Sequence, residues 1–196
     1  GRTIGIDETT KKLTITAEDG FDVYYTLDPK MNGITPTVSA ELKYPAEGIT
    51  LTGNTKVVTI AHKDGWFQSS EASTIISNWF TCPDVVMTQV IENGALKMKL
   101  GLADSTSVDV TGMKIRYRVN DRDYYNPENM AEYTEPIIAN NGDRIWCVAM
   151  KEGYNNSNWN NAYMDFSSYT QCQTPYIDAP SDTKLVTISS SEEGVD

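Results

Sequence analysis

An internal repeat constrains the fold of this chain most, because each copy of a repeated segment must form a similar unit of structure. The pattern Ala-x-Lys-acid-Gly-aromatic-x-x-Ser occurs at 61–69 and again, 88 positions later, at 149–157. Upstream, 23–28 matches 115–120 at an offset of 92. The sequence therefore predicts two successive modules of about 90 residues each.

A third copy of the repeat begins near the end of the sequence. The segment 13–16 recurs at 96–99 and at 186–189, and the acidic turn at 18–22 recurs at 192–196. Because a lone strand has unpaired edges, we expect either a chain cut from a longer array or a strand added to a neighbouring molecule's sheet. The predicted division is module 1 at 1–82, module 2 at 83–172, and the start of an incomplete third repeat at 173–196.

Each module has the residue pattern of β-strands. Apolar and polar residues alternate with a period of two, which is typical of strands buried on one face. By this alternation Val23 and Tyr25 are expected to point inward and Tyr24 outward. The runs 57–61 and 145–150 are apolar on both faces, as expected for central strands. The predicted fold class is all-β: tandem immunoglobulin-like antiparallel β-sandwiches plus the first strand of a further repeat.

Charge and hydropathy exclude two classes of partner. The 196 residues include 27 acidic and 16 basic side chains, a formal net charge of −11. Phosphate binding needs a basic patch, so no nucleic-acid partner is expected. The longest apolar runs are much shorter than the ~20 residues of a membrane-spanning helix, so we expect no membrane insertion.

Cysteine and histidine content argues against several kinds of chemistry. The three cysteines, Cys82, Cys147 and Cys172, provide neither a disulfide framework nor a CxxC metal pair. Cys147 lies in an apolar run and is interpreted as a small buried hydrophobe. With His62 as the single histidine and no GxSxG motif, a Ser-His-Asp mechanism has no support. We expect no catalytic residues, no metal and no cofactor.

Aromatic residues next to asparagines are the candidate binding groups, because rings stack on sugar C–H faces and amides bond to hydroxyls. Trp66 and Tyr154 occupy equivalent positions in the two copies of the repeated motif, which favours a structural role for both. The other candidates lie in the Asn-rich end of module 2 and in the loop at 121–127. The predicted ligand-binding residues are Trp159, Tyr154, Tyr163, Tyr124, Tyr125 and Trp66.

Two groups of acidic residues resemble cation ligands only in composition. Glu18, Asp19 and Asp22 form one group, and Asp121 and Asp123 form the other. Neither has the spacing of an EF-hand loop. Solvated acidic turns explain both groups, and no metal site is predicted.

Two motifs of module 1 carry a resemblance to a known family. The segments 24–28 (YYTLD) and 35–37 (TPT), together with the motif at 61–69, resemble the "YYTLDG…PT" and "A-x-K-x-G-[YW]-x-x-S" patterns of chitobiase/β-hexosaminidase C-terminal-type domains. These domains are also described as fibronectin-type-III-associated repeats. Module 1 departs from the pattern by an insertion at 29–34, and module 2 keeps only the ending.

The resemblance implies a non-catalytic role. Domains of this kind are immunoglobulin-like sandwiches that accompany secreted bacterial glycosidases and cell-surface proteins, and similar sandwiches decorate phage particles. The first hypothesis is an extracellular structural or interaction module of a repeat array, located on a bacterial cell surface or a virion, with a role in adhesion, decoration or spacing. Its expected partners are a surface glycan or protein and further copies of the same repeat. The alternative is a carbohydrate-binding accessory region of a secreted glycoside hydrolase.

Overall fold

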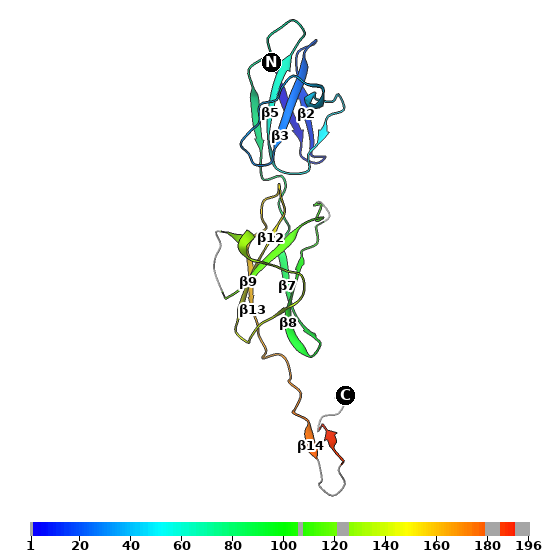
Figure 1. Ribbon diagram of the computed structural model, residues 1–196, viewed down its shortest axis with the longest axis vertical. Coiled ribbons are helices and arrows are strands. Elements are labelled where there is room, and N and C mark those ends of the chain that lie inside the picture. The colour runs from blue at the N-terminus through cyan, green and yellow to red at the C-terminus, as the bar shows by residue number, and fades with distance from the viewer. Residues whose placement is uncertain (1, 106–107, 121–125, 179–184, 191–196) are drawn as a thin grey trace.

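The computed structural model describes residues 2–105, 108–120, 126–178 and 185–190 (Figure 1). Within these ranges the chain consists of antiparallel strands and two short 3-10 helices, η1 (Ala40–Leu42) and η2 (Pro127–Asn129). The predicted all-β fold class is therefore confirmed. None of the helices in these ranges is long and apolar enough to cross a bilayer.

The first half of the chain forms two three-stranded sheets, which we call sandwich 1. One sheet has the order β1-β2-β4, with bounds β1 (Thr3–Asp7), β2 (Lys12–Thr16) and β4 (Ile49–Thr50). The other has the order β3-β5-β6, with bounds β3 (Asp22–Asp28), β5 (Thr55–His62) and β6 (Ala72–Ile76). Leu13 and Ile15 of the first sheet pack against Val23 and Val57 of the second in one buried core.

The second half repeats this arrangement as sandwich 2. One sheet has the order β11-β8-β7, with bounds β7 (Val85–Glu92), β8 (Ala95–Leu102) and β11 (Ile137–Ile138). The other has the order β10-β9-β12-β13, with bounds β9 (Lys114–Val119), β10 (Ala131–Glu132), β12 (Arg144–Met150) and β13 (Asn160–Tyr163). In both sandwiches the pairing corresponds to strands A-B-E and C-F-G of the immunoglobulin fold. The apolar runs predicted as central strands are β5 and β12, each paired on both sides.

Local contacts repeat together with the strand order. In sandwich 1 the peptide N–H of Tyr44 donates to the Val23 carbonyl at 2.8 Å, and the Tyr44 ring meets the Tyr25 ring edge-on at 6.0 Å. The equivalent residues of sandwich 2 are Tyr133, Ile115 and Tyr117. The weak sequence parallel between 44–49 and 133–138 therefore reflects the same tyrosine pair at the same place in each core.

Tyr24 is not exposed to solvent, although the alternation predicted that it points outward. Its side chain is only 7% exposed. The chain after β3 turns back across the outer face of the sheet, where η1 contacts β3 and Lys43 forms a β-bridge with Tyr24. Strand alternation identifies the face of a sheet, but it does not show whether a loop covers that face.

The predicted alignment of 13–16 with 96–99 is also wrong, by two residues. Leu13 and Ile15 are the buried residues of β2, and the buried residues of β8 at the same spacing are Met98 and Leu100. Leu13 therefore corresponds to Met98 and not to Leu96. A shift of two residues leaves every side chain on its original face, so an alternating pattern does not reveal it.

A hairpin follows sandwich 2. Its strands are β14 (Tyr176–Asp178) and β15 (Thr187–Ser189), with Ile177 opposite Ile188. This pairing resembles that of Ile4 with Ile15 in β1 and β2. The apolar side chains of the hairpin are exposed, whereas Ile15 is buried. The recurrence predicted at 192–196 lies outside the described residues, and the module boundaries stay predictions.

The last serine of the repeated motif closes the loop that follows each central strand. The N–H of Ala149 donates to Ser157 Oγ at 2.8 Å, and the N–H of Ser157 donates to the Ala149 carbonyl at 3.0 Å. Ala61 and Ser69 form the same pair of bonds, both at 2.9 Å. The serine is therefore needed for the fold, because its hydroxyl oxygen accepts from a strand N–H that has no other partner.

Substitution Ser157→Ala tests this role. It leaves the buried N–H of Ala149 without an acceptor, so the free energy of unfolding of sandwich 2 should fall by about 1–3 kcal/mol in urea denaturation. The control Ser73→Ala, at an exposed position of β6, should change it by less than about 0.5 kcal/mol. An equally small effect of Ser157→Ala would contradict the assignment.

Candidate functional site

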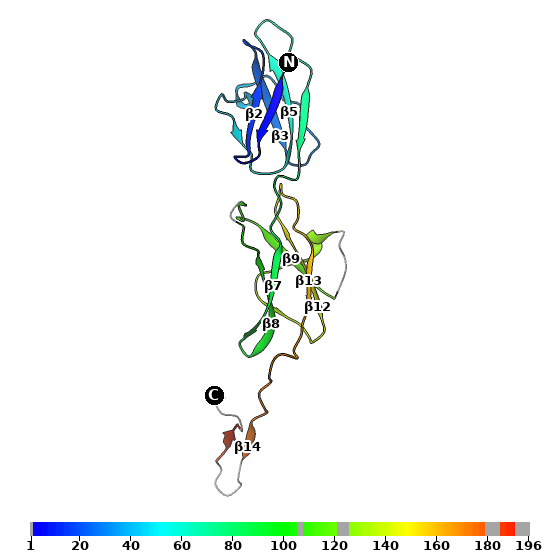
Figure 2. The ribbon, with the colours of Figure 1, turned by 180° about the vertical axis from the view of Figure 1, so that it is seen from behind.

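The loop after β12, which carries the repeated motif of sandwich 2, is hydrogen-bonded to the end of sandwich 1 (Figure 2). Gly153 has a φ of +78°, which favours glycine, and the N–H of Tyr154 donates to the Lys151 carbonyl at 3.0 Å. The Gly153 carbonyl accepts from the N–H of Asn54 at 2.7 Å. A Cβ at Gly53 would lie 3.0 Å from that carbonyl oxygen, so the close approach of the two backbones needs glycine there too.

Asn54 is the central polar residue of this junction and is only 4% exposed. Its Oδ1 accepts from the N–H groups of Trp79 and Phe80, at 3.3 and 3.1 Å. Its Nδ2 donates to the Phe80 carbonyl at 2.9 Å. The side chain of Asn54 therefore binds the segment 79–80 at the end of sandwich 1, while the peptide N–H of Asn54 binds the loop of sandwich 2.

Asn155 joins the connecting segment to the same loop. Its N–H donates to the Phe80 carbonyl at 2.8 Å, and its carbonyl accepts from the N–H of Cys82 at 2.9 Å. These bonds form a parallel β-bridge between Thr81 and Asn155. The side-chain amide of Asn155 donates to Asn78 Oδ1 at 3.0 Å. The connection is therefore paired along its length, which restricts bending between the sandwiches.

Tyr154 supplies the apolar part of the junction. Its ring lies 5.3 Å from the Phe80 ring, and it packs against the cores of both sandwiches. The Lys151 ammonium lies 4.7 Å from the centre of the Tyr154 ring. Lys151 is itself held by Asp109, through a hydrogen bond to its carbonyl and a 3.5 Å ion pair. The N–H of Thr111 and then Lys151 lower the pKa of the Asp109 carboxyl. Tyr154 is thus a structural contact, as its recurrence in the motif predicts.

A second candidate site lies on the outer face of the four-stranded sheet of sandwich 2. Arg144 donates from Nε to Asn161 Oδ1 at 2.8 Å. Its guanidinium lies 4.0 Å from the Trp146 ring and 5.2 Å from the exposed Tyr163 ring. Trp159 is partly buried and precedes β13, in the alternation that Asn161 and Tyr163 continue. The structure thus places Tyr163 on this face, with Trp159 next to β13 in the chain, and leaves Tyr154 at the junction.

The remaining sequence-predicted residues add nothing to either site in the described part of the chain. Trp66 is exposed in the loop after β5. Tyr124 and Tyr125, with Asp121 and Asp123, lie outside the described residues. Of the acidic turn at 18–22, Asp22 forms a 2.9 Å ion pair with Lys43. The described residues contain no cluster of three His, Cys, Asp or Glu side chains that would hold a metal.

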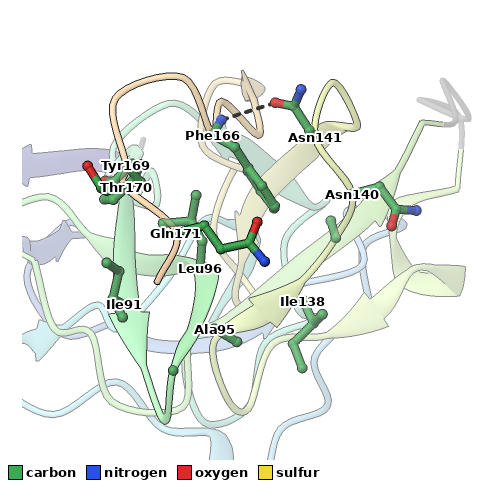
Figure 3. Close-up of a pocket in the computed structure, with 12 residues that line it drawn as sticks. Ile91, Ala95, Leu96, Ile138, Asn140, Asn141, Phe166, Tyr169, Thr170 and Gln171 are labelled. Carbon is green, nitrogen blue, oxygen red and sulfur yellow. Dashed lines mark hydrogen bonds between the residues drawn. The ribbon is translucent and has the colours of Figure 1, made fainter. Parts of the chain in front are cut away.

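A cavity of about 510 Å³ lies beside the turn between β7 and β8 (Figure 3), at the end of sandwich 2 away from sandwich 1 (Figure 1). Its apolar lining includes Leu96, Ile138, Phe166 and Tyr169. The N–H of Phe166 donates to Asn141 Oδ1 at 3.0 Å, which holds the segment after β13 against the turn before β12. Nothing in the sequence pattern predicts this cavity, because Phe166 and Tyr169 follow the last matched segment of module 2.

The cysteines are free thiols in the structure. Burial raises the pKa of the Cys82 thiol and raises that of Cys147 to about 12. Both are therefore neutral near pH 7 and poor nucleophiles. The interpretation of Cys147 as a small buried hydrophobe is confirmed by its burial, and Cys172 is exposed.

Comparisons with known proteins give weak likenesses. No protein-family model matches the chain, and no curated protein is similar to it. Two solved structures are similar at 12% identity: domains 7, 8 and 9 of the S-layer protein SbsC, with a TM-score of 0.31, and domains 4–9 of the surface layer protein SbsC, with 0.30. Each match covers 84% of this chain, and 59% and 30% of the respective SbsC chains. The chain thus spans less than two thirds of either, and at such scores the likeness carries no functional argument.

Substitution Asn54→Ala tests the junction. It removes the acceptor of two N–H groups, those of Trp79 and Phe80, so we expect a loss of about 1–3 kcal/mol in the free energy of unfolding. Urea denaturation followed by tryptophan fluorescence measures the loss. The matched control is Asn32→Ala, at an exposed loop position. If the two variants are equally stable, Asn54 does not have the role assigned to it.

Proposed function

We propose that this chain is a non-catalytic extracellular structural and interaction module, which acts as a stiff spacer in an array of immunoglobulin-like repeats. The observation that carries the proposal is the junction, where a loop of sandwich 2 completes the end of sandwich 1. A flexible tether between two binding domains needs no such contacts, and Gly- or Ser-rich linkers serve that purpose. Here the connecting residues are hydrogen-bonded and partly buried.

The shape and charge of the chain agree with this role. Both views show the two sandwiches end to end along the long axis (Figures 1 and 2). A stiff connection keeps the far ends of the chain apart, which is the property a spacer needs. The net charge of −11 opposes non-specific association between such molecules.

The location is proposed on the family resemblance. The YYTLD and TPT segments and the repeated motif resemble domains that accompany secreted glycosidases and cell-surface proteins. We therefore propose a bacterial cell surface or a phage particle as the location, and adhesion, decoration or spacing as the role.

Distance measurements test the spacer. Spin labels at Ser73→Cys on β6 and Thr88→Cys on β7, both exposed positions, report the separation of the sandwiches in a Cys172→Ser background. Pulsed electron paramagnetic resonance should give one narrow distance distribution. Tyr154→Ala should broaden it, because the contact between the Tyr154 and Phe80 rings is lost, whereas the control Tyr163→Ala should not. A broad distribution without either substitution would refute the spacer.

A second function is favoured by the Arg144 face. Asn161 and Tyr163 are both held by Arg144 and present an amide and an aromatic ring side by side. Such pairs bind saccharides, because the ring stacks on the sugar and the amide bonds to hydroxyls. The alternative function is therefore a carbohydrate-binding accessory region of a secreted glycoside hydrolase.

Glycan-array binding separates the two functions. If the chain is a carbohydrate-binding region, a polysaccharide on the array should bind to it. Trp159→Ala and Tyr163→Ala should then each weaken that binding by about tenfold or more, roughly the contribution of one aromatic contact. Trp66→Ala, on the other sandwich, should bind normally. Absence of binding to any polysaccharide would remove this alternative and leave the spacer unaffected.

A further inference from the structure

Sandwich 1 carries a second copy of the loop that forms the junction. In this loop, 63–67, the N–H of Trp66 donates to the Lys63 carbonyl at 2.9 Å, and Gly65 has a φ of +80°. The Lys63 ammonium lies 5.6 Å from the centre of the Trp66 ring. The corresponding residues of sandwich 2 are Lys151, Gly153 and Tyr154. The two loops are thus built in the same way, with an aromatic residue at the same place.

The two loops differ in what they contact. Tyr154 packs against Phe80 of the other sandwich, whereas Trp66 is 62% exposed and Phe67 is fully exposed. The Phe21 ring lies 6.0 Å from the Trp66 ring, edge-on, and extends the apolar surface. The loop after β12 lies at the junction, so the loop after β5 lies at the opposite end of sandwich 1. An aromatic surface of the kind that forms the junction is therefore unoccupied at that end.

Phe67 stands where Asn155 stands in the junction. The peptide N–H and carbonyl of Asn155 pair with the connecting segment at Phe80 and Cys82. In the part of the chain that the structure describes, the peptide groups of Phe67 have no hydrogen-bond partner. The loop of sandwich 1 therefore offers both the aromatic ring and the backbone groups by which its counterpart docks.

The far end of sandwich 2 is the equivalent of the surface that receives Tyr154. By the 88-residue offset of the repeat, Asn141 and Gly142 take the places of Gly53 and Asn54. The cavity of about 510 Å³ opens at this end, between the turn at 93–95 and the segment 166–171 (Figure 3). A cavity of this size, lined by apolar side chains together with polar ones such as Asn140 and Gln171, is in the range that accepts an aromatic group.

We propose that the Trp66 loop docks onto the far end of sandwich 2 in a second copy of this chain, in the geometry of the internal junction. Such a contact is heterologous, with different surfaces on the two partners, so it propagates head to tail into an open string. The inference rests on the proposed spacer role, because it takes the internal junction as its template, and it adds a partner for the exposed Trp66 loop.

The docking should be weak and salt-dependent. A loop and an end face bury less surface than a standard stable protein interface. Each copy also carries a net charge of −11, so added salt should favour docking by screening the repulsion. Reversible association at high protein concentration is therefore the expected behaviour of the unmodified chain.

Cysteine cross-linking provides the test. In the junction the carbonyl of Asn155 accepts from the N–H of Cys82, which places these residues within the Cα separation that a disulfide spans. Cys172 is exposed and lies two residues after Thr170, which corresponds to Cys82 by the 88-residue offset of the repeat. The variant Phe67→Cys should therefore form a ladder of disulfide-linked oligomers with Cys172 of a second copy under mild oxidation. Because docking concentrates the two thiols locally, it should do so roughly tenfold faster than a control without docking.

Three controls make the result decisive. Ile34→Cys places an exposed thiol elsewhere on sandwich 1 and should cross-link only at the background rate. Phe67→Cys with Cys172→Ser should give no ladder, and Phe67→Cys with Trp66→Ala should return to the background rate. A ladder no faster than that of Ile34→Cys, or one insensitive to Trp66→Ala, overturns the proposal.

Failure here is distinguishable from failure of the spacer. A narrow distance distribution between the sandwiches together with background cross-linking rejects only the docking between copies. A broad distribution rejects the spacer and removes the template for docking as well. Binding of a saccharide that is lost in Trp66→Ala, together with background cross-linking, would assign the loop to a sugar and overturn the proposal.

Discussion

Peptide hydrogen bonds determine how the two sandwiches are joined. They connect the loop at 153–155 of sandwich 2 to Asn54 of sandwich 1 and to the connecting segment 80–82. These bonds join segments that lie far apart in the chain, and their donors are the peptide N–H groups of Asn54, Cys82 and Asn155. Buried polar groups without partners cost about 1–3 kcal/mol each. Bending at the junction would break several of these hydrogen bonds together and leave their N–H and carbonyl groups without partners. The connection therefore resists bending.

The repeated nine-residue motif explains both the interior of each sandwich and its ends. Its first and last residues, alanine and serine, bond to each other and close the loop after the central strand. Its glycine adopts a positive φ that turns the chain, and its lysine lies over the aromatic ring. In sandwich 2 the aromatic residue of the motif, Tyr154, packs against Phe80 of the preceding sandwich. A segment that folds one sandwich thereby also supplies the contact to another, which is a property of stacked repeats.

Much of the fold could be predicted from the sequence, because it depends on local patterns. The apolar runs of β5 and β12 and the turn glycines have clear signatures, and the repeat shows that two similar units exist. The burial of Tyr24 could not be predicted, since it depends on a loop that crosses the outer face of the sheet. The correspondence of Leu13 with Met98 could not either, because it depends on which residues of each strand are buried.

The candidate sites were less predictable than the fold, for a physical reason. Asn54 follows a glycine and has the appearance of an ordinary turn residue. Its role comes from segments that are 25 and about 100 positions away in the chain. Recurrence in the motif pointed to a structural role for Tyr154 and Trp66 alike, but only Tyr154 packs against the cores and Trp66 is exposed, so the motif alone did not separate them. Arg144 was not singled out beside Trp159 and Tyr163, because the contacts between them depend on the pairing of β12 with β13.

Amide hydrogen exchange at the junction tests the central claim most directly, because it reports the hydrogen bonds themselves. The N–H groups of Asn54, Cys82 and Asn155 form the hydrogen bonds between sandwich 1 and the loop at 153–155, and none of these residues belongs to a strand of either sandwich. If the sandwiches form one stiff unit, these amides should exchange about as slowly as those of the neighbouring strands. Exchange at the rate of an unstructured loop, with the strand amides still protected, would contradict it.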